Sequence, residues 1–218
     1  MTTDHRRHVV VFDVNVYLDV ADLLNEPFSW DAFNKAAAAA AREPVPHSDG
    51  AVDALRAIAV CMSGIFAGLE TVEVFTNDHI EDLVHAKAMQ PIVPPEGTDR
   101  RGLGWSHENA DALLRDLVFT VTDRSNGGLV DSTVPDGDPP LDHEDGMVYG
   151  ACKTLVGLDP LANVYCVTRD RGFLAAAAAG ELSGHTKVLS PAQFVALVRA
   201  ARASVSLRRI RPGGPSTT

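Results

Sequence analysis

A run of β-branched and aromatic residues near the amino terminus predicts the first strand. Residues 9–12 read Val-Val-Val-Phe, with no polar residue between them. Such a run is typical of a strand buried on both faces, as in a parallel sheet covered by helices. Asp13 and Asn15 follow at its carboxyl end, where open α/β sheets bind their ligands. The same two residues also suit the cap of the next helix, so both interpretations stay open at this point.

A second segment repeats this pattern further along the chain. Residues 163–167 form a similar apolar run, and Thr168 and Asp170 follow it. Two parallel strands that both lead to a carboxylate place Asp13 and Asp170 at the same edge of the sheet. Helix capping alone does not explain that coincidence.

Helical and extended patterns alternate over the rest of the chain. Apolar residues at helical spacing, together with alanine-rich stretches, predict helices over residues 16–24, 36–41, 51–65, 78–89, 106–117, 147–156, 173–179 and from 191 onward. Further strands are predicted at residues 71–75, 118–122 and 186–189. Residues 123–140 are rich in turn formers and predict an exposed loop. Asp78 and Glu81 have the spacing of a capping box.

Acidic residues gather where the predicted helix after residue 141 begins. Asp142, Glu144 and Asp145 place three carboxylates within four residues. The helix dipole favours carboxylates in a first turn, but three exceed what a cap requires. His143 lies among them, and His79 lies near the acids of the helix over 78–89; we interpret both as surface histidines rather than ligands or general bases.

Composition narrows the class of protein. The chain has 218 residues and 45% hydrophobic content, which suits one domain with its own core, and residues 212–218 are expected to be a disordered tail. No apolar run has the length of a membrane helix, and the amino terminus leads into a strand instead of a signal peptide, so we expect a cytoplasmic protein. Cys61, Cys152 and Cys166 are odd in number and lack metal-ligand spacing, which predicts buried free thiols.

The net charge restricts how the protein can meet a nucleic acid. A formal charge of −10 argues against a general nucleic-acid coat, because binding by counterion release needs concentrated lysine and arginine. It does not exclude an enzyme that meets phosphates through metal ions.

Four segments together resemble the signature regions of PIN-domain nucleases. They are the segment Asp13-Val-Asn15-Val-Tyr-Leu, the acid-bearing helix after Thr76, the segment Asp142-His-Glu-Asp145-Gly-Met-Val, and the segment Val167-Thr-Arg-Asp170-Arg-Gly-Phe-Leu. The resemblance spans roughly residues 8–200. It includes the closing strand and Ser-Pro-x-x-Phe helix of the VapC-like branch associated with toxin–antitoxin systems. Segments near 28–50 and 123–140 look longer than in minimal members, and Asp82 stands where glutamate is commoner.

The resemblance implies a fold, an activity and a set of site residues. The fold is a three-layer α/β/α PIN-like domain with a central parallel sheet over residues 1–211. The activity is a magnesium- or manganese-dependent endoribonuclease that hydrolyses single-stranded RNA, as the toxin of a toxin–antitoxin pair. The implied partners are an antitoxin protein and a second copy of the chain in a homodimer. The implied catalytic acids are Asp13, Asp82 (or the adjacent Glu81), Asp145 and Asp170, with Asp13, Asp145 and Asp170 as metal ligands and Asn15, Thr168, Glu144 and Asp142 in support.

Elementary chemistry agrees with that set. Carboxylates that converge in one crevice repel one another unless hard divalent cations neutralise them, and oxygen ligands suit magnesium or manganese. We therefore expect the carboxylates of Asp13, Asp145 and Asp170 to converge at the sheet edge, within the distance that metal ions bridge.

Other classes remain to be weighed. A phosphatase of the haloacid dehalogenase type needs a second aspartate where this chain has Asn15, and a dinucleotide-binding module needs a Gly-x-Gly-x-x-Gly motif that is absent. The stronger alternatives are a catalytically inactive PIN-like binding or scaffold protein and a non-toxin nuclease that processes RNA or cleaves DNA.

Overall fold

A computed structural model describes residues 6–42, 50–93, 102–132, 134–182 and 184–210 of the chain. The elements in order are β1 (Arg7–Phe12), α1 (Val14–Leu24), α2 (Trp30–Arg42), α3 (Gly50–Cys61), β2 (Ile65–Ala67), β3 (Glu70–Thr76), α4 (Asp78–Met89), α5 (His107–Leu113), the π-helical segment η1 (Leu114–Phe119), α6 (Thr120–Arg124), β4 (Gly128–Leu129), α7 (His143–Leu158), β5 (Asn163–Val167), α8 (Arg171–Ala178), β6 (Lys187–Leu189) and α9 (Pro191–Ile210).

The described strands form one mixed sheet. Its order is β2-β3-β1-β5-β6, and β4 pairs with the end of β3. The pairings of β1 with β3 and β5, of β5 with β6 and of β3 with β4 are parallel. The expected central parallel sheet is therefore present, but β2 runs antiparallel to β3 at its edge, a hairpin that the sequence analysis did not predict. The short connection between β2 and β3 allows only that direction.

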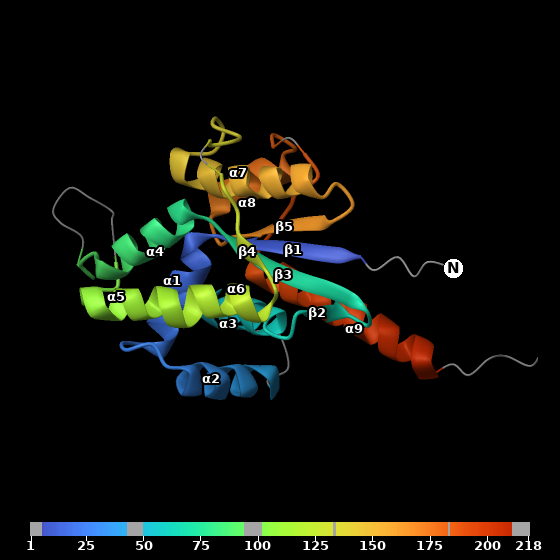
Figure 1. Ribbon diagram of the computed structural model, residues 1–218, viewed down its shortest axis with the longest axis horizontal. Helices are drawn as coiled ribbons and strands as arrows, with labels where there is room; N and C mark the ends of the chain where they lie inside the picture. Colours follow the sequence, from blue (N-terminus) through green and yellow to red (C-terminus); the bar gives the residue numbers. More distant parts are fainter. Residues whose placement is uncertain (1–5, 43–49, 94–101, 133, 183, 211–218) are drawn as a thin grey trace, which may run out of the picture.

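Helices cover both faces of the sheet (Figure 1). In this view α7 and α8 lie above it, and α1, α3 and α9 lie below it. The fold is thus α/β and consistent with a three-layer α/β/α arrangement. The helices α1, α4 and α7 begin at the same side of the sheet, the side where β1 ends.

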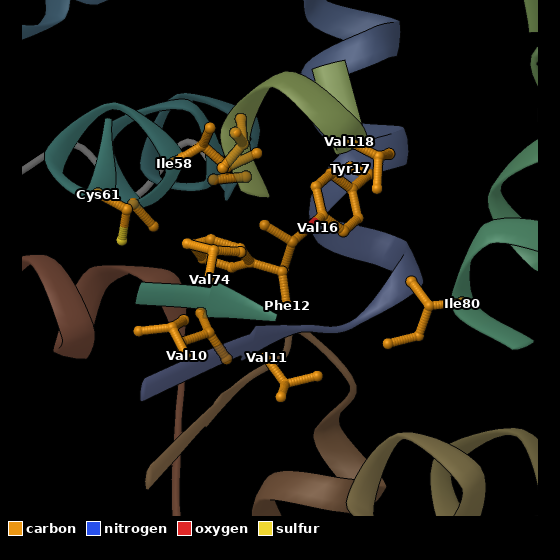
Figure 2. Packing of buried hydrophobic residues seen from close by; sticks show 14 of the residues in the cluster. Val10, Val11, Phe12, Val16, Tyr17, Ile58, Cys61, Val74, Ile80 and Val118 are labelled. Carbon is orange, nitrogen blue, oxygen red and sulfur yellow. The ribbon is translucent and has the colours of Figure 1, made fainter. Parts of the chain in front are cut away.

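The core explains why residues 9–12 of β1 are all apolar. Val11 and Phe12 are fully buried. Phe12 points toward Tyr17 and Ile58, whereas Val11 points to the opposite face of the sheet (Figure 2). Phe12 packs edge-on against Tyr17, with ring centroids 5.9 Å apart. Both faces of the sheet are covered at residues 9–12, so this part of β1 is apolar at every position, as the sequence pattern predicted.

The predicted strand over residues 118–122 is wrong. These residues belong to η1 and α6, which continue α5 without a break. Leu117, Val118 and Val121 are fully buried, so the segment packs one helical face into the core. The periodicity of a short run of β-branched and aromatic residues does not distinguish a strand from a helix. Here the run continues the preceding helix α5 and packs into the core in helical form.

The predicted exposed loop over residues 123–140 is also partly wrong. Residues 123–124 finish α6, and β4 pairs with the end of β3 through Phe75 and Thr76. Before β4, a Cβ at position 127 would lie 1.7 Å from the carbonyl oxygen of Val74, so only glycine fits there. The glycines that indicated a loop instead let the backbone approach the sheet.

Cys61, Cys152 and Cys166 are buried and free, as predicted. The cap of α4 is Asn77, which accepts a bond from the Ile80 amide, and not the predicted Asp78. Among the described helices, none combines the length and hydropathy needed to span a bilayer. The predicted tail, residues 212–218, lies outside the described residues.

Candidate functional site

The candidate site lies where β1 and β5 end side by side. Phe12 pairs with Val167 in the last register position of these strands, and the Asp13 amide donates to the Val167 carbonyl at 2.9 Å. The chain then turns away as α1 and, after three residues, as α8. This geometry brings Asp13 and Thr168 together, although 155 positions separate them in the sequence.

A cleft of about 270 Å³ opens at this edge. Its polar lining combines acids from three distant parts of the chain with one lysine. The full lining consists of Asp13, Val14, Asn15, Leu18, Leu83, Lys87, Asp142, Glu144, Asp145, Val148 and Asp170. The structure therefore brings Asp13, Asp145 and Asp170 to one cleft, together with three of the predicted supporting residues.

Asp13 is the buried centre of this cluster. Its Oδ2 accepts a hydrogen bond from the Thr168 hydroxyl at 2.6 Å and another from the Asn15 side-chain amide. Asp13 stands at the N-cap position of α1 but its side chain makes no capping hydrogen bond, so capping does not account for it. Burial raises its pKa to about 6, although the Thr168 bond opposes this shift.

Asp170 has a structural role as well as a place in the cleft. Its Oδ1 accepts a bond from the Phe173 amide at 2.8 Å and caps α8. Its own amide donates to the Thr168 hydroxyl oxygen at 2.9 Å, so Thr168 links Asp170 to Asp13. Helix capping therefore accounts for the position of one carboxylate oxygen of Asp170.

The acids of α7 form the opposite wall. Asp142 caps the helix by accepting from the Asp145 amide at 2.9 Å. Burial raises the pKa of Asp145 to about 7, and the negative charges of Asp13, Asp142, Asp170 and Glu144 add to this shift. A carboxyl group whose ionisation is opposed by four acids is the kind of group that a cation stabilises.

The acidic side chains line the same cleft, but their carboxylate oxygens do not all converge on one point. In the part of the chain that the structure describes, the only group of three His, Cys, Asp or Glu side chains with ligand atoms all within 4.8 Å of one another is His85, His107 and Asp111. Asp13, Asp145 and Asp170 are therefore spread more widely than a single small ion would hold them. The carboxylates of the cleft are the kind of oxygen ligand that hard divalent cations prefer.

Comparisons with protein-family models, curated proteins and solved structures found no match for this chain.

The helix α4 contributes to the cleft differently from the sequence prediction. Asp82 is exposed and Glu81 is half-buried, and neither lines the cleft. Burial and the neighbouring Asp78 and Asp82 raise the pKa of Glu81 to about 7. The α4 residues that line the cleft are Leu83 and Lys87, one turn apart on the same face.

Lys87 is the site residue that sequence reasoning missed. Its ammonium group lies 2.5 Å from Glu144 Oε2, so an ion pair joins α4 to the first turn of α7. The helical periodicity placed the stem of Lys87 inward, and that was the available signal. Only the packing of α4 beside α7 shows that the charged end reaches the acids.

His79 and His143 lie at the margin of the site. Their rings meet edge-to-face, with centroids 6.0 Å apart, and neither lines the cleft. His143 is exposed, as expected for a surface histidine, whereas His79 is half-buried. Burial, with the positive potential of His143, lowers the pKa of His79 and favours its neutral form.

Proposed function

We propose that this protein is a metal-dependent ribonuclease of the PIN-domain kind that hydrolyses single-stranded RNA. The observation that carries the proposal is the single cleft lined by Asp13, Asp145 and Asp170, which come from three distant segments. Burial and mutual repulsion raise the pKa values of Asp13 and Asp145, which is the electrostatic condition of a cation site without its cation.

Each residue has a definite part in this proposal. Asp13, Asp145 and Asp170 would hold Mg²⁺ or Mn²⁺, and the bonds from Thr168 and Asn15 would keep the Asp13 carboxylate in one orientation. A bound ion supplies positive charge against the scissile phosphate and eases deprotonation of the attacking water. Cleavage of this kind leaves a 5′ phosphate and a 3′ hydroxyl.

Lys87 would assist in binding RNA. Its ammonium group pairs with Glu144 at the cleft wall and is partly exposed. A phosphate that enters the cleft would compete with Glu144 for this cation. The chain thus offers the RNA backbone one positive charge of its own in an otherwise acidic cleft.

The protein would be the toxin of a toxin–antitoxin pair and would form a homodimer. An acidic cleft attracts guanidinium groups, which bind two carboxylate oxygens at once. The antitoxin would therefore be a small basic protein whose chain enters the cleft, and the net charge of −10 would speed its association.

One observation favours a second candidate, a catalytically inactive binding or scaffold protein. The ion pair between Lys87 and Glu144 neutralises part of the acidic charge from within the chain. In that case the acids would serve folding and partner contact, and no metal would be required.

A cleavage assay separates these candidates. Purified protein is incubated with a labelled RNA pool in Mg²⁺, Mn²⁺ or EDTA, and the fragment ends are sequenced; Asp145→Asn is the matched control. The proposal expects metal-dependent fragments with 5′ phosphates from the wild type and none from the variant. No cleavage by folded wild-type protein in either metal would support the scaffold, and cleavage of a parallel DNA pool alone would identify a DNA nuclease.

A further inference from the structure

A second group of potential ligands lies away from the acidic cleft. His85 Nε2 is 2.9 Å from Asp111 Oδ1, and His107 Nδ1 is 3.0 Å from Asp111 Oδ2. The two imidazole rings lie edge-to-face, with an interplanar angle of 79° and centroids 4.9 Å apart. None of the three residues lines the cleft. Two imidazole nitrogens and a carboxylate thus converge in one place.

Two helices hold this group in position. His107 and Asp111 are one turn apart on α5, so both project from the same face toward His85 on α4. Backbone bonds hold the segment just before α5 against the end of α4: the Trp105 amide donates to the Ala88 carbonyl at 3.0 Å, and the Gly104 amide donates to the Gln90 carbonyl at 2.8 Å. The three side chains therefore come from regular elements whose relative placement is secured independently.

We propose that His85, His107 and Asp111 bind a zinc ion or a similar transition-metal ion. Imidazole nitrogens favour zinc and its neighbours, whereas magnesium prefers oxygen ligands alone. Three protein ligands with a fourth, open position form a common zinc geometry. Zinc bonds of about 2.0–2.2 Å in a tetrahedron place ligand atoms roughly 3.4 Å apart. One ligand atom from each of the three residues lies within 4.8 Å of the other two, so small side-chain movements would bring them to that spacing.

The three side chains are exposed enough for an ion to reach them from solvent. The side chain of His85 is 20% exposed, that of Asp111 is 51% exposed and that of His107 is 72% exposed. The ion would enter from solvent, and water would occupy the fourth position. Without metal, Asp111 contacts both imidazoles, so metal binding would exchange these two contacts for three coordinate bonds.

Such an ion would act as a clamp between α4 and α5. It joins two helices across the chain segment that separates His85 from His107. His85 is two residues from Lys87, which lines the acidic cleft. Zinc would therefore hold the α4 wall of the cleft in place while remaining outside the cleft itself.

Equilibrium dialysis and calorimetry with Zn²⁺ test the proposal on the full-length chain without a histidine tag. The wild type is expected to bind one high-affinity zinc ion per chain and to gain thermal stability, since a ligand of the folded state raises its melting midpoint. His85→Ala and His107→Ala should each weaken binding by roughly 100-fold or more, because even outer-shell partners of a zinc site contribute 10–100-fold.

Controls make the outcome specific. His185→Ala removes an exposed histidine elsewhere and should bind zinc like the wild type. Asp13→Asn should also keep the high-affinity ion, which separates this site from the acidic cleft. Circular dichroism without metal checks that each variant is folded, and His107→Ala removes the most exposed member. Wild-type zinc affinity in His107→Ala, or no high-affinity zinc in the wild type, would show that the group is a hydrogen-bonded triad only.

Discussion

Asp13 is a carboxylate that the protein buries at an energetic disadvantage. Its exposed fraction is 4%, and its pKa of about 6 shows that the folded chain resists its ionisation. Thr168 and Asn15 compensate only in part, by donating to the same oxygen. A residue that serves stability alone would not be selected for this property, which is why it points to a site.

Replacing single acids by their amides tests this interpretation. Asp13→Asn and Asp170→Asn should each reduce metal-dependent RNA cleavage by roughly 100-fold or more, the scale of several kcal/mol of lost transition-state stabilisation. Both proteins should stay folded, because an amide oxygen still accepts from Thr168 in the first and still caps α8 in the second. Cleavage is measured under single-turnover conditions and folding by the melting midpoint. Wild-type cleavage in either variant would contradict the assignment.

The raised pKa values predict how stability depends on pH. Folding raises the pKa of Asp13 to about 6 and that of Asp145 to about 7, above the ordinary value of 3.8. The folded state therefore binds more protons than the unfolded state between these values, and stability should fall as pH rises from about 4 to about 7.

The measurement is the melting midpoint in EDTA across this range, repeated with Mn²⁺. Asp145→Asn should show a shallower decline, because it removes the group with the larger shift. Mn²⁺ should raise the midpoint of the wild type more at pH ~7.5 than at pH ~5.5, since only ionised carboxylates bind it. A parallel decline in wild type and variant would assign the pH dependence to other groups.

At the scale of elements, α4 is the helix that departs from the resemblance. The PIN pattern implies a carboxylate from this helix, whereas the cleft receives Lys87, with Asp82 exposed and Glu81 half-buried outside it. The assignment of Asp82 as a catalytic acid stays a prediction. Burial raises the pKa of Asp13, and the positive charge of Lys87 acts in the opposite direction and lowers it.

Lys87→Met is the variant that isolates this cation. It should tighten Mn²⁺ binding, because a positive charge at the cleft wall repels the metal, and it should weaken RNA binding, because a phosphate partner is lost. Lys153→Met is the matched control: Lys153 pairs with Asp136 at 3.2 Å and does not line the cleft. Calorimetry with Mn²⁺ and filter binding with RNA separate the two effects. Unchanged binding of both ligands would leave Lys87 with a purely structural role.

At the scale of the molecule, the acidic surface and the proposed nuclease predict a cellular effect. Expression of this protein alone should slow growth, and co-expression of a small basic protein encoded beside it should restore growth. Asp170→Asn, expressed to the same level, should leave growth unaffected because it lacks the proposed activity. Normal growth of cells that contain folded wild-type protein with demonstrated metal binding would remove the toxin role and leave the nuclease proposal standing.

The sequence by itself determined the elements whose pattern has one structural solution. The apolar runs in β1 and β5 required a sheet covered on both faces, and alanine-rich and periodic segments required helices. It also placed Asp13 and Asp170 at one sheet edge, because neighbouring parallel strands end together.

The tertiary structure decided the segments whose local pattern was ambiguous. Residues 118–122 became helical because the preceding helix carries them into the core, and Gly127 fits against Val74 because no side chain intervenes. Packing of α4 beside α7 brought Lys87 to Glu144, a contact between residues 57 positions apart that no local periodicity specifies.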